Sequence, residues 1–174
     1  YQVNYSYRLR ARWTGDLAEL FARLAAAQAD GYAALVSLPE WVIASASPEL
    51  FFTLQGDLLE SRPMKGTADR LPSADTDKAQ RARLADSEKD RAENLMIVDM
   101  VRNDLGRIAE TGSVSTDELF RVERYPTVWQ MTSTVRCRTR AGLPDLFRAL
   151  FPPASITGAP KARTMQIIRA QEPD

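Results

Sequence analysis

The stretch KDRAENLMIVDMVRNDLGRI, residues 89–108, predicts the helix around which the rest of the fold is arranged. We expect this helix over residues 87–103, because Ser87 and Asp90 form an S-x-x-D capping pattern at its start. The run LMIV at 95–98 and the apolar residues after it cover much of the helix circumference. The pattern therefore predicts a well-buried helix.

The segments on either side of this helix carry strand and helix patterns in separate runs. Strands that occur in runs, without strict alternation with helices, favour an α+β fold with mostly antiparallel sheet. Strand patterns cover 1–12, 32–38, 41–45, 51–55, 58–62, 114–119, 121–124 and 128–138, and helix patterns cover 16–29, 76–86, 143–151 and 160–171.

Turn-forming residues set the expected element boundaries. Gly56-Asp57, between two strand patterns, fits a two-residue hairpin turn. Thr14 is the expected N-cap of the first helix, and Gly31 is its expected C-terminal cap. The polar stretch 63–72 shows neither period and is predicted to be irregular.

The composition indicates a globular protein without a strong charge field. Of the 174 residues, 44% are hydrophobic and 26% are charged, with 23 Lys plus Arg against 23 Asp plus Glu. A zero net charge without a basic stripe argues against nucleic-acid binding. No apolar run approaches the roughly 18–20 residues that cross a bilayer, so no membrane contact is expected.

Two features of the composition narrow the chemistry. The chain has no histidine, which excludes Ser-His-Asp catalysis and histidine-ligated metals. Cys137 is the only cysteine, so no disulfide forms within the chain and a cytoplasmic location fits. Catalysis therefore has to use carboxylates, lysine, hydroxyls, backbone amides or a hard cation held by oxygens.

Asp90 and Glu93 form the first candidate site. They stand three residues apart, so their carboxylates project from one face of the predicted helix about one turn apart. Since the following run is apolar, Glu93 is expected to face a cleft, where Mg²⁺ is the natural partner for carboxylates without histidine. The alternative is a solvated acidic face on which Lys89 and Glu93 pair.

Lys65-Gly66-Thr67 forms the second candidate site. A lysine beside a glycine in a tight turn can act as a nucleophile when it is desolvated. The amides of Gly66 and Thr67 can approach a carboxylate or phosphate closely. The alternative is an exposed loop lysine. For the enzymatic interpretation, Lys65 and the acidic pair must face one shared cavity.

The segment SITGAPK, residues 155–161, forms the third candidate site. Thr157 or Gly158 is the expected cap of a helix with Pro160 at its first position, and the first-turn amides together with Lys161 would make an anion site. The alternative is an ordinary capped helix. Glu49, in Ser-Pro-Glu at a strand edge, is a candidate general acid.

Taken in order, these segments resemble the anthranilate synthase component I family of chorismate-binding enzymes. The resemblance covers essentially the whole chain, and its motifs occur in the family's order. The matching stretches are YQVN at 1–4, SPELF at 47–51, SRPMKGTADR at 61–70, KDRAENLMIVDMVRNDLGRI at 89–108, GSV at 112–114, YPTV at 125–128 and SITGAPKARTMQII at 155–168.

The residue after Pro63-Met64 separates the family's subgroups. Anthranilate synthases usually carry a small residue there, whereas aminodeoxychorismate synthases often carry lysine, as this chain does at Lys65. In that subgroup the lysine is thought to attack the chorismate ring before ammonia displaces it. By the same resemblance, Glu49 is the general acid that helps the ring hydroxyl to leave.

The resemblance also implies ligands for the substrate and the metal. Gly66 and Thr67 would contact chorismate, and Glu93 would ligate Mg²⁺ with Asp90 contributing through water. The physical reason is that chorismate is a dianion with a poor leaving group, so a cation and an acid are both needed. Many family members have a histidine where this chain has Gln130, which can orient the substrate but cannot shuttle a proton.

The resemblance further implies that the chain is an internal piece. We expect residues 1–174 to be a partial chorismate-binding domain without the family's N-terminal domain and C-terminal segment, and to be inactive alone. The implied reaction makes 4-amino-4-deoxychorismate for folate and para-aminobenzoate synthesis, with ammonia from a glutamine amidotransferase subunit. The alternatives are anthranilate synthase, salicylate or isochorismate synthase, and a non-catalytic binding or scaffolding piece.

Overall fold

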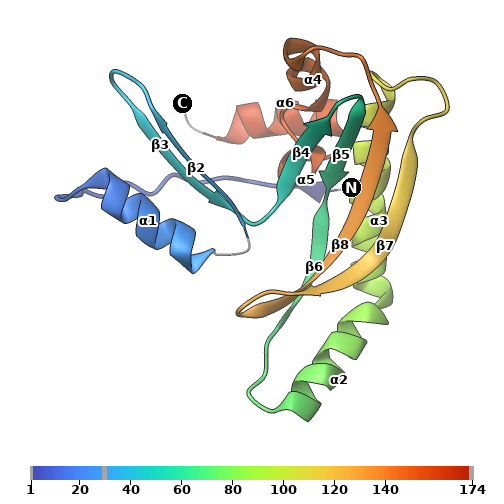
Figure 1. Ribbon diagram of the computed structural model, residues 1–174, viewed down its shortest axis with the longest axis horizontal. Helices are drawn as coiled ribbons and strands as arrows, with labels where there is room; N and C mark the ends of the chain where they lie inside the picture. The colour runs from blue at the N-terminus through green and yellow to red at the C-terminus, as the bar shows by residue number, and fades with distance from the viewer. Residues whose placement is uncertain (1, 29–30, 173–174) are drawn as a thin grey trace. The chain divides into compact units, whose positions relative to one another are not determined.

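The computed structural model describes residues 2–28 and 31–172, and the chain divides into two compact units (Figure 1). The smaller unit comprises Tyr7–Leu50, and the larger comprises Tyr1–Ser6 with Phe51–Asp174. The residue registers of the paired strands in both units are antiparallel. The predicted α+β class with mostly antiparallel sheet is confirmed.

The smaller unit holds one helix and a two-stranded sheet. The strands pair from Tyr32 opposite Ser47 to Ser37 opposite Val42, as the two strand patterns predicted. The elements are α1 (Leu17–Ala27), β2 (Tyr32–Ser37) and β3 (Val42–Ser47).

Three predictions for the first part of the chain are wrong in detail. The N-cap of α1 is Asp16 rather than Thr14, because the Asp16 carboxylate accepts a hydrogen bond from the Ala18 amide at 2.7 Å. The C-cap is Gln28 rather than Gly31. Of the strand predicted over 1–12, the described part contains only β1 (Gln2–Val3), since the alternating residues that follow have no strand beside them there.

The larger unit is built on an antiparallel sheet in which β8 is central (Figure 1). One side of β8 pairs with β5 near its end and with β6 near its start, and the other side pairs with β7. The elements are β4 (Leu50–Gln55), β5 (Leu58–Arg62), β6 (Met64–Asp69), β7 (Ser115–Arg124) and β8 (Val128–Arg138).

The stretch 63–72, predicted to be irregular, contains strand β6. Pro63 separates β5 from β6, and the register of β6 shifts between Met64 and Thr67. A proline and a bulge break the period-two alternation on which the prediction depended. The Gly56-Asp57 hairpin is confirmed, with Gly56 at a φ of 63°.

Helices cover one face of the sheet, with α3 lying behind β7 and β8 in Figure 1. The cap of α3 is as predicted, because the Ser87 hydroxyl accepts a hydrogen bond from the Asp90 amide. The elements are α2 (Ala74–Ala85), α3 (Glu88–Gly106), α4 (Leu143–Leu150), α5 (Ala154–Thr157) and α6 (Lys161–Gln171), and β1 pairs with β9 (Gly158–Ala159).

The core of the larger unit forms between α3, α4 and the sheet. Ile97 and Val98 of α3 are buried, but Leu95 is 50% exposed, so α3 buries one side and the prediction of burial around most of the helix is wrong. The main cluster of buried residues is Leu59, Val98, Leu105, Val135, Cys137, Leu146, Ala149 and Leu150.

Among the described residues, no helix combines the length and the apolar character that a bilayer crossing requires. This observation agrees with the sequence, in which no long apolar run occurs.

Candidate functional site

A bulge in β6 determines the position of the lysine motif, Lys65-Gly66-Thr67. Met64 lies opposite Thr132 and Thr67 lies opposite Gln130, so β6 advances three residues where β8 advances two. The extra residue interrupts the backbone ladder at Lys65 and Gly66. Gly66 has a φ of 93°, a conformation that residues with side chains rarely adopt.

Side chains take over the hydrogen bonds of this bulge. The Asn94 amide on α3 donates to the Lys65 carbonyl at 3.2 Å, and the Gln130 amide donates to the Gly66 carbonyl at 2.9 Å. The Thr67 hydroxyl in turn donates to the Gln130 side-chain oxygen at 2.8 Å. Three predicted site residues, Gly66, Thr67 and Gln130, are thus joined directly beside Lys65.

The start of α3 packs directly on the bulge. A Cβ atom added to Gly66 would lie 3.0 Å from the Asp90 Cβ and 3.3 Å from the Met131 Cβ. The Ser87 hydroxyl donates to the Asp90 carboxylate at 2.5 Å, which fixes that carboxylate beside the helix start. Asp90 therefore lies against the lysine motif, although the two are far apart in the sequence.

Glu93 lies one turn further along α3. Its side chain is 43% exposed, and its carboxylate is 3.7 Å from the Lys89 amine. The pairing that we considered as the alternative for this face is therefore present. The residue that follows, Asn94, bonds to Lys65, so Glu93 is on the part of α3 that contacts β6.

The carboxylate oxygens of Asp90 and Glu93 are of the type that Mg²⁺ prefers, but two carboxylates are few for a metal site. Mg²⁺ takes six oxygens and is usually held by one or two carboxylates with water and substrate oxygens. Asp90 and Glu93 can supply two carboxylates, and the part of the chain that the structure describes contains no group of three acidic or other metal-binding side chains. These two residues therefore fit a site that is completed by other ligands.

A hollow of about 500 Å³ opens between β6 and the junction of α2 with α3. Two predicted site residues, Thr67 and Asp90, line it, and neither Lys65 nor Glu93 is among the described residues of its lining. The hollow therefore brings together Asp90 and Thr67, and a cavity that Lys65 shares with both acidic residues stays a prediction. The lining residues are Thr67, Ala68, Arg83, Leu84, Asp86, Ser87 and Asp90.

Glu49 belongs to the smaller unit, where it follows β3. Its backbone amide donates to the Ser47 hydroxyl at 3.2 Å, and that hydroxyl bonds back to the Glu49 carbonyl. The Ser-Pro-Glu turn is thus fixed locally. The role of Glu49 as a general acid stays a prediction.

Residues of the third candidate site have partners within the chain. The Lys161 amine donates to the Asp104 carboxylate at 2.9 Å and to the Leu150 carbonyl at 3.3 Å, so its charge is matched. The N-cap of α6 is Pro160, and the prediction of Thr157 or Gly158 as the cap is wrong.

The backbone at Thr157 and Gly158 connects α5 to a strand. Thr157 bonds through its hydroxyl to the Pro153 carbonyl, which holds the end of α5. Gly158 begins β9 opposite Val3, at a φ of 123° and with Gln2 too close for a side chain to fit. Substrate binding by Thr157, Gly158 and Lys161 stays a prediction.

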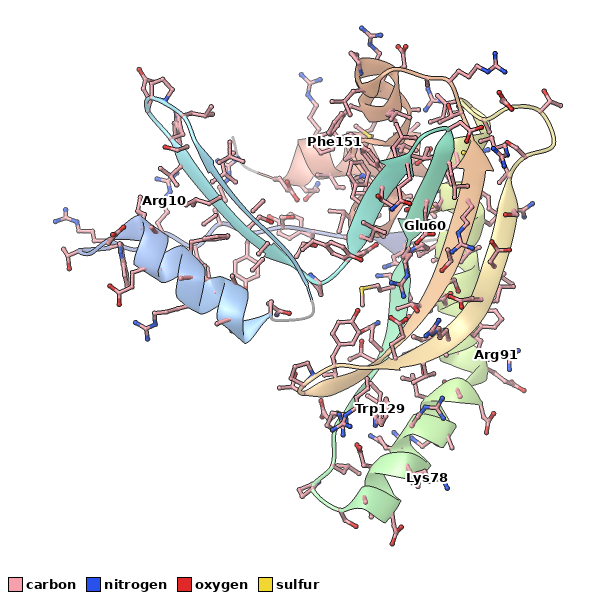
Figure 2. The ribbon with its side chains drawn as sticks, in the orientation of Figure 1. Arg10, Glu60, Lys78, Arg91, Trp129 and Phe151 are labelled. Carbon is pink, nitrogen blue, oxygen red and sulfur yellow. The ribbon has the colours of Figure 1, made fainter. Side chains whose placement is uncertain are left out.

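The sequence analysis did not identify the cluster around Asp77. The Asp77 carboxylate accepts hydrogen bonds from the Arg70 guanidinium, the Leu71 amide and the Trp129 indole, at 2.9–3.0 Å. Figure 2 shows Trp129 beside α2. The Arg70 guanidinium holds the pKa of Asp77 well below its usual range. The sequence signal that could have indicated this cluster was Arg70, the last residue of the stretch 61–70. Its partner, Asp77, is on the following helix, α2.

Comparison with known proteins gives one consistent result. The chain is 49% identical to aminodeoxychorismate synthase component 1 of Klebsiella aerogenes and 46% identical to that of Escherichia coli K12, each over 99% of this chain and 39% of the relative. The chain therefore spans about two fifths of the length of these curated relatives. The crystal structure of anthranilate synthase component I from Streptococcus pneumoniae TIGR4 is similar with a TM-score of 0.80 and 31% identity, over 93% of this chain and 36% of that one.

The family model described as chorismate binding enzyme matches residues 1–174, the entire chain. The chain belongs to the family of chorismate binding enzymes.

Proposed function

We propose that the chain is part of an aminodeoxychorismate synthase component 1, which converts chorismate and ammonia to 4-amino-4-deoxychorismate. The single observation that carries this choice is Lys65, the motif residue that follows Pro63-Met64 and lies in the β6 bulge. The identity of 46–49% to relatives of that name supports it. Lysine is one of the side chains that form covalent intermediates, so a lysine at this position suits nucleophilic catalysis.

Lys65 would act by covalent catalysis in two displacements. Its amine attacks the chorismate ring, a carbon–nitrogen bond forms, and the ring hydroxyl leaves as water after Glu49 gives it a proton. Ammonia then attacks the ring, and the bond to the Lys65 nitrogen breaks. Lys65 is released as the same amine that attacked, and the ammonium group now on the ring returns its extra proton to Glu49. The sum is chorismate and ammonia giving 4-amino-4-deoxychorismate and water. Protonation of the leaving oxygen typically contributes about 10²–10⁴-fold.

The remaining site residues would bind and orient the substrate. The Gly66 and Thr67 amides with Gln130 would hold chorismate beside Lys65, and Thr157, Gly158 and Lys161 would contribute a second set of contacts. Asp90 and Glu93 would hold Mg²⁺, which when bound neutralises a substrate carboxylate. A glutamine amidotransferase partner would supply the ammonia.

Product analysis of the whole protein tests this function. Given chorismate and ammonia, the protein should form aminodeoxychorismate, and the Lys65→Ala variant should lose most of this activity. The matched control is Lys78→Ala, which removes an exposed lysine on α2 and should leave activity unchanged (Figure 2). Retention of full activity by Lys65→Ala would defeat the assignment of the nucleophile.

The second candidate is anthranilate synthase, which the structural similarity to the Streptococcus pneumoniae enzyme favours. Lys65 argues against it, because a small residue is usual at this position in that subgroup. The same product analysis decides between the two, since anthranilate and aminodeoxychorismate are separable compounds. Anthranilate as the sole product would favour the second candidate.

A further inference from the structure

We propose that Asn94 is a positioning residue, which holds the β6 bulge so that the Lys65 amine is aimed at the substrate. The proposal rests on the proposed function, in which Lys65 is the nucleophile. Asn94 itself is too deeply buried to touch substrate, since it is 1% exposed. It acts through the backbone of Lys65.

The side chain of Asn94 uses both of its ends. Its amide nitrogen donates to the Lys65 carbonyl at 3.2 Å and lies 3.4 Å from the Met131 carbonyl. Its oxygen accepts from the Ser133 hydroxyl at 2.5 Å. Two of the strands next to α3 therefore give Asn94 partners: β6 through Lys65, and β8 through Met131 and Ser133.

The bulge cannot hold itself through the sheet ladder. Among the described strands β6 pairs only with β8, so in a regular strand one of the two neighbouring carbonyls of Lys65 and Gly66 would face β8 and have a backbone partner there. The extra residue of β6 interrupts the register at that point. A buried carbonyl without a partner costs free energy, so a side chain has to replace the ladder. Gln130 does this for Gly66 and Asn94 does it for Lys65.

The anchor fixes the direction of the Lys65 side chain relative to α3. Side chains of a strand alternate between its two faces, and a bulge changes which face the next residue takes. With its carbonyl bonded to α3 and the Gly66 backbone packed on Asp90, the Lys65 backbone has little freedom to rotate. The buried Asn94 side chain thus fixes the position of the Lys65 backbone relative to α3, the helix that carries Asp90 and Glu93.

Only an amide of this size satisfies the three partners. Two of them are carbonyl oxygens that need a donor, and the third is a hydroxyl that donates to Asn94. Aspartate has nearly the same shape, but its ionised carboxylate would face the two carbonyl oxygens with acceptors. Alanine would take away the donor to the Lys65 carbonyl and the acceptor for the Ser133 hydroxyl.

The test compares Asn94→Asp and Asn94→Ala with Ser133→Ala in the whole protein. Ser133→Ala removes two hydrogen bonds, the one that its hydroxyl donates to Asn94 and the one that it accepts from the Phe120 amide, and leaves the bond to Lys65 in place. It therefore controls for loss of stability. For both Asn94 variants we expect kcat to fall about 10²-fold and KM to change less than about threefold, because misplacing a reacting group by ~1 Å has this effect without weakening substrate binding. Ser133→Ala should keep kcat within about threefold of the unaltered protein, because the nucleophile stays in place.

A second readout does not depend on the reaction. An amine-acetylating reagent, followed by peptide mass spectrometry, gives the modification rate of Lys65 relative to that of exposed Lys78. We expect this ratio to change in the Asn94 variants and to stay constant in Ser133→Ala. If Lys65 proves not to be the nucleophile, the proposed function fails while this ratio still reports whether Asn94 positions the amine.

A double-variant cycle completes the test. If Asn94 acts through Lys65, Asn94→Asp should have no further effect on the residual rate of Lys65→Ala. The proposal is overturned if the two effects multiply, if Ser133→Ala lowers kcat as much as Asn94→Asp does, or if the Lys65 modification ratio is unchanged in a folded Asn94→Ala variant. Circular dichroism and the thermal midpoint establish which variants are folded, and Asn94→Ala is decisive where Asn94→Asp does not fold.

Discussion

Gly66 is required by the structure for two separate reasons. Its φ of 93° is in the region that side chains disfavour, and an added Cβ would be 3.0 Å from the Asp90 Cβ. We expected this glycine to let its amide approach an anion. The close approach that the structure contains is between β6 and α3, so Gly66 serves first to bring the lysine motif against the helix.

Gly66→Ala should therefore lower the free energy of unfolding by about 1–3 kcal/mol, because it adds both backbone strain and a steric conflict. Gly56→Ala is a matched control, since Gly56 also has a positive φ of 63° but open space around the position of a Cβ. Urea unfolding of both variants separates the two effects. Equal losses of stability would mean that the contact with Asp90 relaxes without cost.

At the scale of elements, Asp77 ties the start of α2 to the sheet. Its carboxylate bonds to the end of β6 through Arg70 and to β8 through Trp129, and the Arg70 guanidinium also lies 4.6 Å from the centroid of the Trp129 ring. The Arg70 and Asp77 side chains are both largely buried. A charged pair that is shielded and multiply bonded orients elements as well as stabilising them.

The depressed pKa of Asp77 gives a prediction for acid stability. A carboxylate with a lowered pKa in the folded state contributes stability above its unfolded pKa of about 4 and loses it as the pH falls toward the folded value. The urea midpoint of the unaltered protein should therefore fall below about pH 4 more steeply than that of Asp77→Asn.

Asp75→Asn provides the control for this measurement, because Asp75 is an exposed acid in the same first turn of α2. Its pH profile should follow that of the unaltered protein. Parallel profiles for Asp77→Asn and the unaltered protein would show that the ion pair with Arg70 does not stabilise the fold.

The sequence predicted those elements whose patterns are local. α3 has a cap at Ser87 and an apolar run, and both were visible without the structure. β6 was missed because its bulge depends on β8 and on Asn94 of α3, which are distant in the sequence. The extent of burial of α3 was overestimated, because an apolar run does not show which of its sides a neighbour covers.

For the candidate site, too, local patterns were predicted from the sequence and contacts between distant segments were not. The residue types at Lys65, Gly66 and Glu93 indicated chemistry, and the resemblance to a family gave them roles. Asn94 and Asp77 were not identified, because their importance comes from contacts across elements rather than from a pattern. Contacts of this kind become visible only once the strands are paired.

At the scale of the whole molecule, charge is balanced locally. Arg136 of β8 pairs with Glu60 of β5 and with Asp117 of β7, and these interactions lie on one face of the sheet. With 23 acidic and 23 basic residues, these 174 residues carry no net charge that would attract a dianion over a long range. Under the proposed function, binding of chorismate would therefore depend on local donors and on the proposed cation.

The small number of carboxylates at the candidate site predicts that Mg²⁺ binds weakly to this chain alone. Produced alone, residues 1–174 should bind Mg²⁺ with a dissociation constant weaker than about 1 mM, equivalent to about −4 kcal/mol, because two carboxylates are too few for a tight site. In the whole protein with chorismate present, Glu93→Gln should weaken Mg²⁺ binding measurably. Asp99→Asn should not, since the Asp99 side chain is on the same helix but 78% exposed and paired with Arg102. Isothermal titration measures all three, and tight stoichiometric binding by residues 1–174 would contradict the assignment of Asp90 and Glu93 as an incomplete site.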